Sequence, residues 1–401
     1  MDSKTSRQEQ RRNMMLTTPI AKVIPQMAIP TMVSMLIMSM YNMADTYFVS
    51  SLGIEATGAV GINASLQSFI QMAGSALAIG ANSYIARLLG ANKDEQASRV
   101  LSTAFFSAII TGSLMMIFGL TFMDPLVRFL GAKDPLVIKY GKDYASFMLY
   151  AAPFMTSSFV MNQCLRAEGS ATFSMIGMVS GAILNIFLDP LFIFVFNWGV
   201  AGAAIATAIS KVVSFLILLS PYWRGHTLLH ISWKKFGYTK DIAQEISKMG
   251  APTFFRSGLM TLAQIITNNL ASGFSPAALA AISVVNRIMM FITSAILGFG
   301  QGYQPVAGFN WGAKRYDRVL EAFKFSSIVG VSGVSILALF AGIFAPNLIG
   351  VFTDNPETIR IGVYALRLQC AVMPIQAWVM VVNMTYAGLG KAMGAAVLSL
   401  S

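Results

Sequence analysis

Long runs of apolar residues separated by short polar stretches dominate the chain. Runs of roughly 20 or more mostly apolar residues, the length that spans a bilayer as a helix, occupy 27–50, 57–86, 100–122, 144–165, 171–196, 199–222, 249–272, 277–309, 325–346 and 362–388. A further run begins after Lys391. Lipid offers no partner for open backbone groups, and the alternating pattern of a barrel strand is absent, so each run predicts a transmembrane helix.

Composition agrees with a membrane setting. The 401 residues are 55% hydrophobic and 11% charged, which is more apolar than the surface of a soluble globular protein tolerates. We therefore expect an all-α polytopic membrane protein embedded in the lipid bilayer, with no removable signal peptide because its first apolar run already has spanning length. Cys164 and Cys370 lie within apolar runs and are expected to be buried thiols rather than a disulfide.

The positive charge of the chain is distributed unevenly. A net charge of +11 is compatible with a nucleic-acid partner, but position matters more than the total. Most basic residues lie in the N-terminal tail and in every second loop after it, including Lys234 and Lys235. The positive-inside rule therefore predicts a cytoplasmic N-terminus in a cell (inner) membrane, and no nucleic-acid partner. The loop around 124–143, with Arg128 and Lys139 on the opposite side, is an irregularity.

The chain also repeats itself at an offset of about 222 residues, a feature that indicates duplicated architecture. Pro30 aligns with Pro252 and Gly80 with Gly302, and after a one-residue gap the register continues through Pro153 with Pro374 and Asn162 with Asn383. The first half holds an even number of predicted helices, six, so we expect two parallel lobes related by an axis along the membrane normal.

The repeat predicts the domain organisation. We expect a cytoplasmic tail at 1–22, an N-lobe at 23–222, a cytoplasmic linker at 223–248 and a C-lobe at 249–401. Residue 401 corresponds to residue 180 of the first half, so the C-lobe stops after about four to five of its six helices. Either the chain is a fragment of a longer protein, or its second lobe lacks helices eleven and twelve.

Two carboxylates are the main candidates for chemistry. Asp45 and Asp189 are the acidic residues well inside apolar runs, where a charge costs at least about 3 kcal/mol and marks a functional site. Each lies about 18 residues from the start of its run, or about 27 Å along a helix, so both reach one depth and can share a proton or an ion. Tyr41 and Asn185, four residues earlier, lie on the same helical faces. Alternatively, the two aspartates cap helix kinks or pair with a buried arginine.

Prolines and arginines add further candidates. Pro190 contributes no N–H and leaves the carbonyl of Ile186 free to solvate a cation, and Pro30 is a candidate hinge. Arg256 and Arg287 lie within apolar stretches of the C-lobe. They either hold that lobe rigid by bonding to carbonyl oxygens or contact an anionic group of a substrate.

Several motifs together resemble the MATE (multidrug and toxic compound extrusion) transporters in their bacterial and archaeal branch: YNMADTYFVSSLG, GANSYIARLLGA, LRAEGSA, LNIFLDP and GVAGAAIATAIS. The resemblance covers essentially the whole chain. It implies a monomeric, V-shaped, two-lobe exporter that exchanges small organic cations or amphiphiles for inward-moving H⁺ or Na⁺. Carried over by position, the ion site is Asp45, Asn185, Asp189 and Thr207, and Pro30 is the bending proline. A departure is that Thr267 occupies the C-lobe position equivalent to Asp45, which confines the expected coupling to the N-lobe.

Other function classes find less support. The chain has no GxxxxGK[ST] motif for nucleotide binding, and its only histidines, His226 and His230, lack a third metal ligand. We therefore expect no enzyme activity and no cofactor besides the coupling ion. Two alternatives remain: a flippase of lipid-linked or other amphiphilic substrates from the same superfamily, which the arginine pair favours, and a non-transporting membrane enzyme or receptor.

Overall fold

The computed structural model describes residues 2–132, 134–391 and 394. In this part of the chain the structure is helical, without strands. After the mostly polar helix α1 (Asp2–Thr17), the long helices are α2 (Ile20–Ser50), α3 (Ile54–Gly90), α4 (Asp94–Thr121), α6 (Pro135–Ala167), α7 (Ala171–Pro190), α8 (Gly199–Trp223), α9 (Lys240–Phe274), α10 (Pro276–Gly312), α11 (Tyr316–Ile343) and α13 (Pro356–Gly388). The short helices α5 (Met123–Phe129) and α12 (Ala345–Gly350) lie in connections.

Each apolar run expected to span the membrane falls largely within one of the long helices. Among the described residues, 7 helices are long and apolar enough to cross a membrane by length and composition alone. Helices α3, α6 and α9 have spanning length with more polar sequence. The predicted all-α membrane fold is confirmed, while the run after Lys391 lies almost wholly outside the described residues. Helix α9 begins at Lys240, inside the stretch expected to link the lobes.

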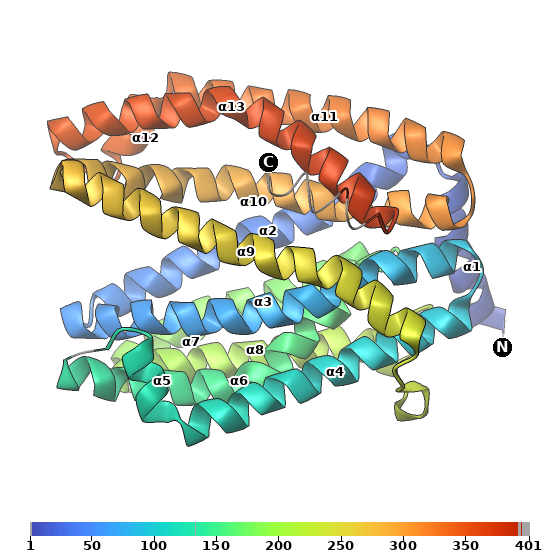
Figure 1. The fold of residues 1–401 in the computed structure, drawn as a ribbon, viewed down its shortest axis with the longest axis horizontal. Helices are drawn as coiled ribbons and strands as arrows, with labels where there is room; N and C mark the ends of the chain where they lie inside the picture. Colours follow the sequence, from blue (N-terminus) through green and yellow to red (C-terminus); the bar gives the residue numbers. More distant parts are fainter. Residues whose placement is uncertain (1, 133, 392–393, 395–401) are drawn as a thin grey trace.

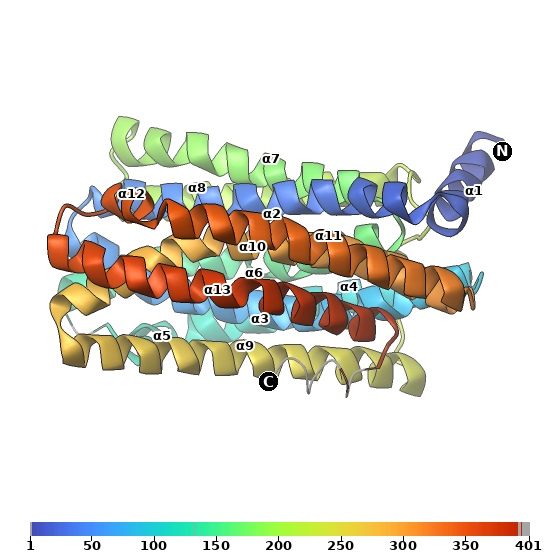
Figure 2. The same cartoon turned by 90° about the horizontal axis from the view of Figure 1, so that it is seen from above.

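The helices form two groups that follow the two halves of the sequence. In the first group α3 and α4 pack on α6, α8 packs on α6, and α7 packs on α2 and α8. In the second group α13 packs on α10 and α11. Figure 1 shows the second group above the first, with all long axes near the horizontal, and Figure 2 shows α7 at one edge of the bundle, alongside α8 and α2.

The lobes are joined by two crossings that are equivalent under the sequence repeat. Helix α2 packs on α10, and its counterpart α9 packs on α3. The backbones approach so closely that a Cβ atom at Gly80 would lie 2.6 Å from the carbonyl oxygen of Ile246, and one at Gly250 would lie 2.7 Å from that of Ala76. Both separations are too short for packed atoms, so only glycine permits this contact between the lobes.

One end of the bundle is closed by a reciprocal contact between the last turns of α3 and α10. Gly90 meets the backbone of Phe309, and Gly312 meets the backbone of Arg87. The repeat pairs Gly90 with Gly312 and Arg87 with Phe309, so these two contacts are images of each other. The guanidinium of Arg87 also forms a 2.5 Å ion pair with Glu245 of α9. Backbone contact and charge pairing therefore hold the lobes together at this end.

Candidate ion-coupling site

Helices α2, α7 and α8 bring the predicted site residues together inside the N-lobe. Asn185 and Asp189 lie one turn apart near the end of α7 and are 1% and 0% exposed. Asp45 comes from the last turns of α2, and Thr207 of α8 is fully buried. Because α7 packs on both α2 and α8, these four residues converge although they are far apart in the sequence.

Asn185 lies at the centre of the polar contacts. Its Nδ2 atom donates hydrogen bonds of 3.2 Å to Oδ1 of Asp189 and of 3.2 Å to Oγ1 of Thr207. The carboxyl groups of Asp45 and Asp189 lie within hydrogen-bonding reach of each other. The side chain of Tyr41, which is 2% exposed, lies close to Thr207. All five residues singled out from the sequence for this site thus form one connected cluster.

Three buried oxygens of this cluster have no hydrogen-bond partner in the protein: Oδ1 of Asp45, Oδ2 of Asp189 and Oδ1 of Asn185. A buried acceptor without a partner costs about 1–3 kcal/mol, and more if it is charged. Two carboxylates, an amide oxygen and a hydroxyl are ligands that suit a hard cation such as Na⁺. Two carboxylates in contact are equally suited to holding a shared proton. The donor set therefore fits either coupling ion.

Local backbone geometry changes next to the second carboxylate. Helix α7 ends at Pro190 and continues as the π-helical turn η1 (Leu191–Val195). Proline has no N–H to donate to the preceding turn, and the N–H of Leu191 bonds to the carbonyl of Leu188 instead. Wide turns of this kind are frequent at functional sites. Pro30 lies inside the continuous helix α2 together with Pro25, and its role as a hinge stays a prediction.

Three further polar residues belong to the cluster and were missed by sequence reasoning. Tyr144 of α6 is 2% exposed and lies close to Thr207, while Gln67 of α3 lies close to Tyr41. Lys211 of α8 places its Nζ atom 5.0 Å from the centroid of the Tyr41 ring. The spacing of Lys211, four residues after Thr207 on the same helical face, was a usable signal.

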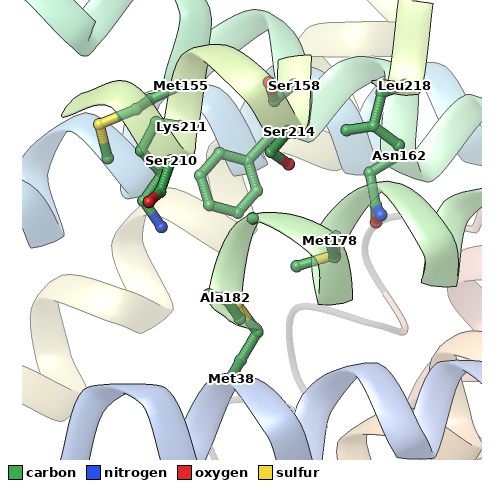
Figure 3. Close-up of a pocket in the computed structure, with 12 residues that line it drawn as sticks. Met38, Met155, Ser158, Asn162, Met178, Ala182, Ser210, Lys211, Ser214 and Leu218 are labelled. Atoms are coloured by element: carbon green, nitrogen blue, oxygen red, sulfur yellow. The ribbon is translucent and has the colours of Figure 1, made fainter. Parts of the chain in front are cut away.

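A cavity adjoins the cluster between α2, α6, α7 and α8 (Figure 3). Its wall combines flexible apolar side chains with a few hydroxyl and amide groups, a composition that adapts to varied ligands. Lys211 is the lysine on this wall, and it connects the cavity with the carboxylate cluster. The lining residues include Met38, Met155, Phe159, Met178, Asn162, Ser158, Ser210 and Ser214.

The two arginines predicted in the C-lobe lie apart from the carboxylates. Arg256 of α9 lines a second cavity at the lobe interface, together with Gln163, Gln301 and Gln304. The Nε atom of Arg256 is buried without a hydrogen-bond partner. Arg287 of α10 is exposed. A structural or substrate-binding role for Arg256 and Arg287 stays a prediction.

Comparison with known proteins settles the family. The MatE family profile matches residues 30–191 and 252–401. The chain belongs to the MATE family. It is 26% identical over 386 residues to the multidrug export protein MepA of Staphylococcus aureus, covering 96% of this chain and 85% of that protein. MepA of Staphylococcus saprophyticus is 27% identical over 356 residues, covering 87% and 77%.

Solved structures agree. One solved structure superposes on this chain with a TM-score of 0.91 at 28% identity, covering 96% of this chain and 86% of that chain. It is described as the outward-facing conformation of a multidrug resistance MATE family transporter of the MOP superfamily. A MOP superfamily transporter from Pyrococcus furiosus, described as having a binding pocket of reverse polarity, gives 0.90 at 28% identity, covering 97% and 87%. The predicted MATE resemblance and two-lobe fold are confirmed, and this MATE protein belongs to a family of transporters rather than enzymes.

Proposed function

We propose that this protein is a secondary active multidrug exporter of the cell membrane. It moves cationic amphipathic compounds outward in exchange for H⁺ or Na⁺ bound at Asp45 and Asp189. The observation that carries the proposal is the buried carboxylate pair with unpartnered oxygens beside a methionine-lined cavity. The relatives named multidrug export proteins support the reaction class.

The physical basis of exchange is competition for negative charge. Two ionised carboxylates inside an apolar lobe are unstable without a compensating proton or cation. A bound proton or Na⁺ satisfies them, and so does an organic cation in the adjoining cavity. The ion binds better in one conformation and the substrate binds better in the other. The inward movement of the ion therefore drives the outward movement of the substrate.

The closed end of the bundle is proposed to face the cytoplasm. The ion pair of Arg87 with Glu245 lies at this end, and so does the basic linker that precedes α9. The positive-inside rule assigns such an end, with the N-terminus, to the cytoplasmic side. The conformation is then outward-facing, as in the related structure of that description. Because one chain supplies every residue of the cluster, the working unit is proposed to be a monomer.

The test is efflux of a fluorescent organic cation from cells under imposed H⁺ or Na⁺ gradients. Asp189→Asn keeps the shape of the side chain but cannot ionise, so gradient-driven efflux should fall to background at equal membrane expression. The matched control is Asp143→Asn, which removes an exposed carboxylate from α6 and should export as the wild type does. Full efflux by Asp189→Asn would rule out this coupling site.

A second candidate is a flippase for lipid-linked or other amphiphilic substrates. Arg256, with an unpartnered Nε atom on the wall of the cavity between the lobes, favours an anionic substrate group. If the wild type exports no organic cation under either gradient, headgroup translocation in proteoliposomes becomes the decisive assay. Loss of that translocation in Arg256→Gln would support the flippase.

A further inference from the structure

Lys211 places a positive charge in the middle of a membrane-spanning helix. It is the central residue of α8, which runs 25 residues from Gly199 to Trp223. Either end of the helix is about 18 Å away, whereas a lysine stem extends its ammonium by only about 6 Å. The charge therefore cannot reach the membrane surface. A lysine at this depth is costly and indicates a function rather than a surface role.

The ammonium of Lys211 lies near the carboxylate cluster but forms no salt bridge with a carboxylate of the described residues. In the described part of the chain, no salt bridge within 4.0 Å includes Lys211. It lies 5.0 Å from the centre of the Tyr41 ring, in a cation–π arrangement, and interacts electrostatically with Asp45. Since Tyr41 precedes Asp45 by one helical turn, the ring holds the ammonium one turn away from the carboxylate.

The charged and titratable groups around Lys211 come from three helices packed on or near α8. They are Tyr41 and Asp45 of α2, Tyr144 and Arg166 of α6, and Asp189 of α7. Arg166 is bound to Asn162, Ser174 and Gln301, and contacts the cavity only through Asn162 and Met178. Among the described residues, Lys211 is thus a positive charge near the carboxylates that no salt bridge holds in place.

The charge balance of the site follows from these neighbours. With both carboxylates ionised, Lys211 cancels one of two negative charges, so one more positive charge completes neutralisation. A proton can provide it by binding to one carboxylate oxygen. Na⁺ instead needs several oxygens at once, including the carboxylates that the ammonium already attracts, and a second cation beside the ammonium is repelled.

We infer that Lys211 is the built-in cation of the coupling site and that it makes this MATE protein proton-coupled by excluding Na⁺. The inference rests on the proposed exchange function and selects its ion. When the proton leaves, the flexible stem of Lys211 lets the ammonium approach Asp45 and compensate the exposed charge. Proton binding releases the ammonium back to the Tyr41 ring. Lys211 therefore acts as a specificity-determining residue and not as a ligand of the substrate.

The test uses purified protein in proteoliposomes with a fluorescent organic cation and an imposed H⁺ or Na⁺ gradient. Lys211→Met and Lys211→Gln remove the charge, whereas Lys211→Arg retains it. The wild type and Lys211→Arg should transport only with the H⁺ gradient. The neutral variants should gain transport with the Na⁺ gradient, and their half-maximal pH should rise by about one unit or more, because a nearby positive charge no longer favours proton release.

A second measurement is independent of transport. Na⁺ should raise the melting temperature of Lys211→Met and Lys211→Gln but leave that of the wild type unchanged. Wild-type transport driven by Na⁺ would overturn the inference and leave the exporter intact. Neutral variants with the wild-type pH profile and no Na⁺ response would also overturn it. If no variant transports the dye, the exporter fails, and the Na⁺-dependent melting shift still decides whether Lys211 excludes Na⁺.

Discussion

Replacing Gly80 by alanine tests whether the lobes are closed by direct contact of their backbones. The new Cβ atom would lie 2.6 Å from the carbonyl oxygen and 2.8 Å from the Cα atom of Ile246. Packed carbon atoms prefer about 3.5–4.0 Å, so α3 and α9 must move apart by about 1 Å. Both neighbouring atoms belong to the backbone of α9, and no side-chain rotation can relieve the overlap.

The cost of this substitution falls on the closed conformation rather than on the fold of either lobe. Overpacking of a tight contact costs about 1–3 kcal/mol. A value near the middle of that range changes an equilibrium between two conformations by about 30-fold. Since α3 belongs to the N-lobe and α9 to the C-lobe, separation of the lobes at this end removes the overlap. We therefore expect Gly80→Ala to populate a conformation that is open at the proposed cytoplasmic end.

Double electron–electron resonance measures the distance between two spin labels and therefore reports this opening directly. Lys93 and Lys314 are exposed at the α3–α4 and α10–α11 turns, one on each lobe, and are suitable for labelling after substitution by cysteine. The native Cys164 and Cys370 are buried, and replacing them by serine removes any background. The wild type should show one short distance in liposomes. Gly80→Ala should add a longer-distance population.

Gly61→Ala is the matched control, because Gly61 lies in the same helix with open space at its Cβ position. It should keep the wild-type distances, and alanine should stabilise the helix by up to about 1 kcal/mol. If Gly80→Ala shows the same distances and melting temperature as Gly61→Ala, the lobes are not held by this backbone contact. A melting temperature lowered without any change of distance would equally refute the proposed relief by lobe separation.

Two further predictions concern the closed end. Glu245→Gln leaves the partly buried Arg87 without its counter-charge and should weaken closure by about 1–3 kcal/mol. The same spin labels measure this change. The double variant Arg87→Glu with Glu245→Arg exchanges the two charges and should restore part of the lost stability of the closed conformation. An unchanged distance distribution in Glu245→Gln would contradict the role of this ion pair. Burial raises the pKa of Glu168 to about 8, against the opposing effect of Arg11 and two backbone N–H groups. The folded state thus binds the proton more tightly, so stability is full below pH 4.5 and is lost as pH rises through about 8. Melting in detergent should show this slope and Glu168→Gln should flatten it; equal slopes would refute it.

The membrane setting explains why so much of the fold could be predicted from the sequence. A bilayer forces every spanning segment to satisfy its own backbone, so apolar length alone predicts helices. The sequence repeat then predicts two equivalent lobes, and the structure shows this in the paired contacts of Gly90 with Phe309 and of Gly312 with Arg87. Asp45 and Asp189 could be identified from the sequence because a charge at membrane depth is costly, so acidic residues inside apolar runs are rare and indicate a function.

What the sequence could not determine is the rotation of each helix about its axis and the order in which helices pack. These two properties decide that Gln67, Tyr144 and Lys211 face the same carboxylates, because they come from three different helices. They also decide that Arg256 lines a cavity between the lobes while Arg287 is exposed. Hydrophobic periodicity is weak in a helix that is apolar on all sides, so the polar cluster is revealed only when α2, α3, α6, α7 and α8 are packed together.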